Sequence, residues 1–290
     1  MFGQLIVSGL AVGACYSLLA LAMVIIYKTS EVLNFAQGEM AMVSTFVTFT
    51  VLDSYHVAFP WAVVLTFLFA ILLGVFFEIA FLRRAKDPNV LGLMIITLGF
   101  EMVLMGFAGW KWGPDQRSFP FPVSSVETYK IGGYLISKIN LWTILISFIL
   151  MFVLYLFFRY TQLGIAMRAT QQNPLAARVM GIRTKRILSF TWAISSMVGA
   201  VAGMLIAALG VLDPPMMMDP LLKGFASAVL GGMTSLPGSA VGGALLGIIE
   251  NLFGGYVSLA FKSVVAFAII VVMLCLRPSG LLARHYKRKV

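Results

Sequence analysis

The chain has 290 residues, of which 60% are hydrophobic and 11% are charged, and its net charge is +10. Soluble domains contain about 45–50% apolar and about 25% charged residues, so this composition excludes a water-soluble fold and predicts an integral membrane protein. The basic residues form short clusters between apolar runs, which argues against a nucleic-acid-binding protein and is typical of cytoplasmic segments between membrane crossings.

Apolar runs recur along the chain at lengths that suit a bilayer crossing, which needs about 20 residues. In chain order they cover residues 2–27, 32–52, 60–82, 91–110, 141–158, 187–212, 221–254 and 257–276. Glycine and proline near 234–238 break the long run 221–254, and such interruptions predict half-length helices that line protein or a cavity. We therefore predict one all-α integral membrane domain over 1–290, with about eight to ten transmembrane or broken helices.

The distribution of basic residues predicts the orientation. No Lys or Arg precedes the first apolar run and Lys28 follows it, which places the N-terminus outside. Residues 159–186 contain six basic residues and no acidic one, and residues 284–289 form a second basic cluster. Both are expected in the cytoplasm, whereas the Pro- and Gly-containing stretch 111–140 is expected to be an external loop.

Ionisable residues inside apolar runs are costly and usually face a cavity or a partner. Glu39 and Glu101 lie deepest, and we expect them to line a translocation pathway together with Asn34, Gln37 and Thr97. The alternative is a buried, hydrogen-bonded arrangement that holds helices together. Lys223 also lies inside an apolar run. Glu78 is close to Arg83 and Arg84 and is expected at the interface, and Glu250 and Lys262 lie near segment ends, where they are expected to extend toward the interface.

A short helix is predicted within the cytoplasmic segment 159–186. Asn173 is a good N-cap, Pro174 suits the first helical position, and Gly181 suits the residue after the C-terminus. The helix is too short to cross a membrane, so it is expected either to dock on a cytoplasmic partner or to rest on the membrane surface. The residues expected to dock are Pro174, Ala176, Ala177, Arg178, Met180 and Gly181.

Small residues recur four positions apart, for example at Gly9 and Gly13, which creates a groove where another helix can approach closely. Helix packing is favoured here over a direct role in substrate passage. The same interpretation covers the broken helix near the C-terminus, whose residues are Gly231, Gly232, Pro237, Gly238, Gly242 and Gly243.

The sequence contains no catalytic set. It has no Gly-x4-Gly-Lys-Ser/Thr phosphate loop, no His-Glu-x-x-His zinc motif and no nucleophile elbow. Its two cysteines lie inside apolar runs, and its two histidines lack the spacing of metal ligands. We therefore expect neither an enzyme nor a metal or cofactor held by this chain.

Four segments, in order, resemble the branched-chain amino acid permeases of ABC importers. Residues 34–39 (NFAQGE) resemble the family's Asn-Phe-Ala-His-Gly motif, with Gln37 in place of His. Residues 163–182 resemble its coupling loop, residues 229–243 its glycine-rich segment, and residues 277–282 its C-terminal end. Leu175 stands where the general coupling motif begins with Glu.

The resemblance implies the first permease subunit of a high-affinity branched-chain amino acid importer in a bacterial inner membrane. Its expected partners are two ATP-binding subunits that carry ATP and Mg²⁺, a second permease, a periplasmic binding protein and the lipid bilayer. Substrate would then pass between the permeases by alternating access. Two alternatives remain open: a urea or short-amide importer within the same family, and a stand-alone ion- or proton-coupled carrier or channel that uses Glu39 and Glu101.

Overall fold

The computed structural model describes residues 2–85, 89–123, 127–131, 134–277 and 279–282, so the basic cluster at 284–289 lies outside the described residues. Within them, six helices are long and apolar enough to cross a membrane. These are α1 (Phe2–Ser30), α3 (Phe59–Phe77) with its π-helical continuation η1 (Glu78–Leu82), α4 (Val90–Trp112), α5 (Lys138–Tyr160), α8 (Thr184–Leu209) and α10 (Leu236–Tyr256).

Of the shorter described helices, three are apolar segments within the bundle. They are α2 (Gln37–Asp53), α9 (Met218–Gly231) and α11 (Lys262–Leu276). Together these elements follow the predicted apolar runs closely, with boundaries shifted by a few residues. The fold is helical apart from a small hairpin of β1 (Thr128–Ile131) and β2 (Tyr134–Ser137), which the all-α expectation did not include.

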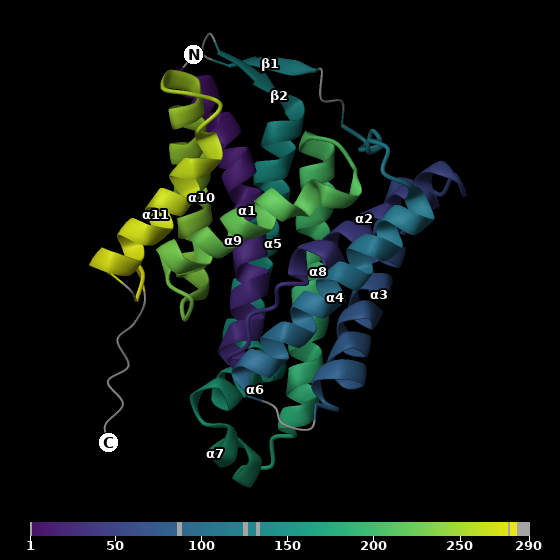
Figure 1. The fold of residues 1–290 in the computed structure, drawn as a ribbon, viewed down its shortest axis with the longest axis vertical. Helices are drawn as coiled ribbons and strands as arrows, with labels where there is room; N and C mark the ends of the chain where they lie inside the picture. Colours follow the sequence, from purple (N-terminus) through teal and green to yellow (C-terminus); the bar gives the residue numbers. More distant parts are fainter. Residues whose placement is uncertain (1, 86–88, 124–126, 132–133, 278, 283–290) are drawn as a thin grey trace.

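Helix α1 runs through the middle of the molecule, in contact with α5, α8, α9 and α10 (Figure 1). In its most apolar stretch 89% of the residues are buried, against 17% for α4 and 22% for α5. The outer faces of α4 and α5 are therefore apolar and uncovered, as expected for surfaces that meet lipid or another subunit.

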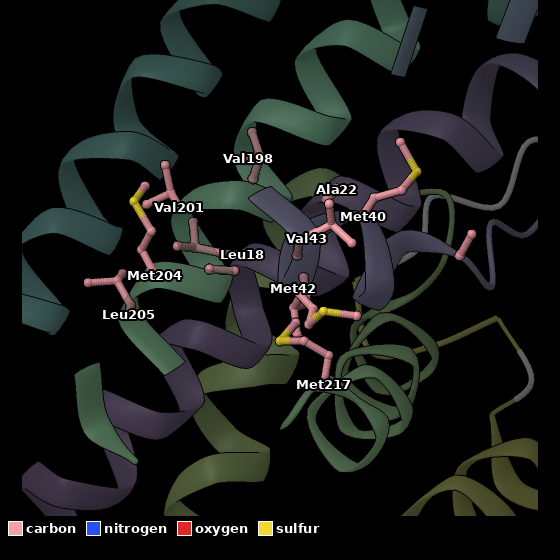
Figure 2. Close-up of a cluster of buried hydrophobic side chains, with 14 of the residues drawn as sticks. Leu18, Ala22, Met40, Met42, Val43, Val198, Val201, Met204, Leu205 and Met217 are labelled. Carbon is pink, nitrogen blue, oxygen red and sulfur yellow. The ribbon is translucent and has the colours of Figure 1, made fainter. Parts of the chain in front are cut away.

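The main core lies between α1, α2 and α8, and Figure 2 shows how side chains from these helices interlock there. Helix α2 is enclosed by it, because twelve of its 17 residues are buried. Met217, at the end of the 3₁₀ turn η2 (Pro214–Met217), approaches the α2 side from below in Figure 2. The labelled members of the core are Leu18, Ala22, Met40, Met42, Val43, Val198, Val201, Met204, Leu205 and Met217.

Glycines form the seam between α1 and α10. A Cβ atom added to Gly13 would meet the carbonyl oxygen of Gly243, and one added to Gly247 would meet the backbone of Gly9 and Gly13. The two backbones therefore touch along this line, which is the close approach that small residues four apart permit.

The long apolar run 221–254 is divided into α9 and α10 by a turn at residues 232–235. Helix α9 ends at Gly231, and Gly232 has a φ of +105°, which few residues other than glycine adopt. Ser235 then caps α10 by accepting a hydrogen bond from the Gly238 N–H at 3.1 Å, and Pro237 lies in the first turn. Gly231 and Gly238 are in backbone contact across the turn, so neither has room for a side chain.

The described C-terminal residues close this turn. The N–H groups of Leu281 and Leu282 donate to the carbonyl oxygens of Leu230 and Gly231 at 2.9 and 3.1 Å. These are last-turn carbonyls of α9, which have no partner inside their own helix. The segment after α11 therefore fastens the end of α9.

The two connecting segments lie at opposite ends of the molecule (Figure 1). The connection from α4 to α5 spans residues 113–137, shorter than the expected 111–140, and β2 of its hairpin lies beside the start of α1. Its Arg117 pairs with Leu212 through two backbone hydrogen bonds of 2.9 Å. At the other end, α6 (Gln162–Gln172) and α7 (Pro174–Val179) fill most of the expected 159–186 segment and project from the helices.

Candidate functional site

The polar segment that precedes α2 is held by a buried hydrogen-bond network. Asn34 Nδ2 donates to Gln37 Oε1 at 3.0 Å, and Gln37 Nε2 donates to the Ser195 carbonyl oxygen at 3.2 Å. Ser195 Oγ lies 3.0 Å from Gln37 Oε1 and donates to the Ala22 carbonyl oxygen at 2.8 Å. In this conformation, Asn34 and Gln37 join α2 to α1 and α8. A side-chain oxygen of Asn34 stays without a partner among the described residues.

Thr97 connects α4 to the same segment. Its Oγ1 donates to the Met94 carbonyl oxygen at 2.8 Å and accepts a hydrogen bond from the Phe35 N–H at 3.2 Å. Thr97 is fully buried. The segment between α1 and α2 is therefore anchored on three sides, by α1, α4 and α8.

Glu39 of α2 and Glu101 of α4 lie on helices that pack against each other. Glu39 lies in the first turn of α2 with a relative exposure of 1%, while Glu101 is partly exposed. Glu101 is close enough to Glu39 for their charges to interact. Within the described part of the chain, Glu39 Oε2 has no hydrogen-bond partner. Glu39 thus has a buried carboxylate oxygen with acceptor capacity to spare, able to hold a proton or to accept a hydrogen bond from a cationic group.

A second charged cluster was missed as a cluster by the sequence analysis. Lys223 of α9 places Nζ 2.5 Å from Glu250 Oε1 of α10 and 2.5 Å from Asp219 Oδ2, with the Tyr16 ring of α1 beside it. Lys223 and Glu250 are 5% and 1% exposed. The expectation that Glu250 reaches toward the interface is wrong, because Lys223 neutralises it inside the protein. Opposite charges on either side of the break within the run 221–254 were the available signal.

Glu78 is buried as well. Arg83 donates to both of its carboxylate oxygens, and Ser189 of α8 donates to Oε2 at 2.7 Å. The proximity of Glu78 to Arg83 was expected, but its contact with α8 was not. This cluster ties η1 to α8 at the end of the molecule that carries α6 and α7.

The turn between α6 and α7 forms for the local reasons expected. Asn173 Oδ1 accepts hydrogen bonds from the N–H groups of Leu175 and Ala176, both at 3.0 Å, and Pro174 occupies the first turn. Gly181 has a φ of +85°, which ends the helix in a conformation that suits glycine.

Helix α7 presents an apolar patch made of Leu175, Val179 and Met180. Their relative exposures are 71%, 87% and 81%, so the described residues leave them almost uncovered. Ala177 points inward and is buried, while Arg178 is exposed and donates to Thr184 Oγ1 at 2.9 Å. The sequence analysis missed Leu175 and Val179, although their spacing of four residues places them on one side of a helix.

Comparison with known proteins decides the family. Residues 5–274 match the family described as "Branched-chain amino acid transport system / permease component". The chain belongs to this permease family. The match spans all of the candidate residues from Asn34 to Gly243 and confirms the resemblance inferred from the motifs.

Two permeases illustrate the relation. The chain is 29% identical to the high-affinity branched-chain amino acid transport system permease protein LivH of Salmonella typhimurium, over 100% of this chain and 98% of LivH. It is 29% identical to the corresponding permease protein BraD of Pseudomonas aeruginosa, over 99% of this chain and 97% of BraD. It is thus a multi-pass membrane subunit of a transport system rather than an enzyme.

One solved structure shares the fold. It is that of PsaBC from Streptococcus pneumoniae in complex with Fab, which matches with a TM-score of 0.50 over 94% of this chain and 91% of the other. The sequences are 13% identical, so the likeness concerns the arrangement of the helices alone.

Proposed function

We propose that this permease is the membrane-spanning subunit of an ATP-driven importer for branched-chain or similar hydrophobic amino acids in a bacterial inner membrane. It works with a second permease, two ATP-binding subunits and a periplasmic binding protein. Closure of the ATP-binding subunits pulls on α7, and the permeases rock to alternate access. The exposed patch on α7 carries this proposal.

Three large apolar side chains stand uncovered on a six-residue helix and its C-cap, at the end where basic residues concentrate. Such a cluster, rimmed by polar and basic groups, is typical of a surface that enters a groove on a protein partner. The short α7 is fixed by its cap and by buried Ala177, so force applied to the patch is passed to α6 and α8. This is the requirement for coupling an ATPase to a permease.

The proposed substrate is supported by the relatives, whose names specify branched-chain amino acids. An amino acid carries an ammonium group, and the carboxylates of Glu39 and Glu101 offer it a transient partner along the pathway between the permeases. Urea and short amides lack that positive charge, so the two carboxylates favour an amino acid over them.

Val179→Asp tests the docking of α7. A carboxylate forced into an apolar interface is costly, so ATP-driven uptake by the assembled transporter in proteoliposomes should fall at least about tenfold. Co-purification of the ATP-binding subunits should fall with it. Gln162→Asp is the matched control, since it adds the same charge at the exposed start of α6, where a helix N-terminus favours it.

Equal uptake by both variants would contradict the docking role. Uptake that needs no ATP and follows the proton gradient would instead support the stand-alone carrier, for which the unpartnered oxygen of Glu39 is the specific argument. In that case Glu39→Gln and Glu101→Gln become the informative variants.

A further inference from the structure

A cavity of about 780 Å³ lies between α1, α5, α6 and the turn that joins α9 to α10. It is separate from the Asn34–Gln37 network and from the Lys223 cluster, because none of those residues lines it. Its walls are mainly apolar and include Leu21, Ile25, Met151, Leu154, Phe158 and Leu236.

Three basic residues complete the lining: Lys28 near the end of α1, Arg159 near the end of α5, and Arg168 of α6. None of the described residues that line the cavity is acidic. Among the described residues, none of the three forms an ion pair, and Arg168 is close enough to Lys28 for their charges to repel. The charge at this end of the cavity is therefore positive, and the described part of the chain does not compensate it.

The guanidinium groups are held in place by neighbouring groups. Arg159 Nη1 donates to the Tyr155 hydroxyl, and its guanidinium lies 5.7 and 5.4 Å from the Tyr155 and Tyr160 ring centres. Arg168 Nη2 donates to the Arg159 carbonyl oxygen at 3.2 Å. Each guanidinium donates one of these hydrogen bonds, which leaves further donors free, since a guanidinium has five N–H bonds.

The start of α10 adds to the positive potential. Thr234, Ser235, Leu236 and Pro237 all line the cavity, and they form the turn and first residues of this 21-residue helix. The N-terminus of a helix carries a partial positive charge that favours an anion. The cavity thus combines apolar walls with a polar lining in which the basic side chains and the N-terminus of α10 both contribute positive charge.

We propose that this cavity binds an anionic phospholipid, with an acyl chain against the apolar walls and the phosphate at Lys28, Arg159 and Arg168. A volume of about 780 Å³ lies within the range of small-molecule sites, about 300–1,000 Å³, and suits part of an acyl chain. Basic pockets between membrane helices on the cytoplasmic side recognise anionic headgroups in this way. The assignment to the cytoplasmic leaflet rests on the proposed orientation of α6 and α7.

Such a lipid would join elements that transmit movement. Arg159 and Arg168 lie at the α5–α6 junction, which leads directly into α7, whereas the turn at 234–237 belongs to the α9–α10 pair. A ligand that contacts both sides stabilises the arrangement in which they are close, in proportion to its concentration over its Kd.

The test measures lipid binding by the purified full-length chain, using phosphatidylglycerol and phosphatidylcholine of identical acyl chains in native mass spectrometry. We expect several-fold preferential retention of phosphatidylglycerol. The triple variant Lys28→Gln, Arg159→Gln, Arg168→Gln should remove most of that preference, so that the two lipids are retained about equally, because each basic residue near an anionic headgroup contributes measurably.

A matched control removes the same charge elsewhere at this end of the molecule. Arg183→Gln, Lys185→Gln, Arg186→Gln changes three exposed basic residues that do not line the cavity, and it should bind phosphatidylglycerol like the unaltered chain. Equal losses in both triple variants would overturn the proposal in favour of a general surface charge effect.

The apolar part of the site is tested separately with Ala240→Phe, which places a ring in the cavity without changing charge. Its retention of phosphatidylglycerol should also fall several-fold, and unchanged retention would overturn the acyl-chain assignment. Inorganic phosphate at millimolar concentration should not displace the lipid; displacement would identify a free-anion site instead. Since the readout is lipid retention, it is independent of uptake and of ATPase docking.

Discussion

Lys223 illustrates how a single residue organises the helices around α1. Its ammonium group contacts the carboxylates of Glu250 and Asp219 and lies 5.7 Å from the Tyr16 ring centre, so it joins α9, α10 and α1. Asp219 is more than half exposed, whereas Glu250 depends on Lys223 for neutralisation. Removing one member of a buried pair leaves an uncompensated charge, while replacing both by neutral residues is often harmless.

Lys223→Met should therefore lower the free energy of unfolding by about 3–5 kcal/mol, and the double variant Lys223→Met, Glu250→Gln should recover most of the loss. The measurement is reversible unfolding in mixed detergent micelles, followed by circular dichroism. Lys111→Met, which removes an exposed cation from α4, serves as the control and should change stability little. A double variant as unstable as Lys223→Met would contradict the coupling.

At the scale of elements, the α1–α10 contact depends on glycine more than on large apolar side chains. Gly9 and Gly13 face Gly243 and Gly247, and any added Cβ would meet backbone atoms, which cannot move aside as a flexible side chain can. Lipid tails are as apolar as the helices, so close packing has to provide the stabilisation that the hydrophobic effect provides in water.

Gly247→Ala should lower the free energy of unfolding by about 1–3 kcal/mol, because the methyl group separates the two helices. Gly106→Ala in α4 is a matched control, since no atom lies within 4 Å of its added Cβ. It should leave stability unchanged or raise it by up to about 1 kcal/mol through better helix propensity. Equal stability of the two variants would show that α1 and α10 can move apart without loss of stability.

At the scale of the whole molecule, the two ends differ in chemistry. The β1–β2 hairpin lies beside the start of α1, where Gln4 Nε2 donates to the Leu135 carbonyl oxygen at 3.1 Å. The α6–α7 segment and its basic residues lie at the opposite end. The positive-inside rule predicts that the hairpin end is external and that α7 is cytoplasmic.

Cysteine labelling in whole cells checks this orientation. With Cys275 replaced by Ala and Cys15 left in place because it is buried, Lys130→Cys in the hairpin should react with a membrane-impermeant maleimide in intact spheroplasts. Val179→Cys on α7 should react only after permeabilisation. The reverse pattern would invert the orientation and place α7 away from any cytoplasmic ATPase.

Several features of the fold could be predicted from short stretches of sequence. The class of protein followed from composition, because so much apolar surface has no place in a soluble domain. The α7 helix followed from Asn173, Pro174 and Gly181, whose effects act within one turn of the chain. The break between α9 and α10 followed from Pro237 and the glycines around it for the same reason. The family followed from motifs that are themselves contiguous.

The tertiary structure was needed for contacts between distant residues. Gln37 meets Ser195 across 158 positions of the chain, and Lys223 meets Glu250 across two helices, pairings that no local pattern encodes. The sequence did not predict which helices are interior either. Both α1 and α4 are strongly apolar, yet α1 is enclosed by other helices and α4 is uncovered. The reason is physical: in a bilayer, lipid-facing and protein-facing surfaces have the same hydrophobicity, so the packing of helices against one another settles which side chains are buried.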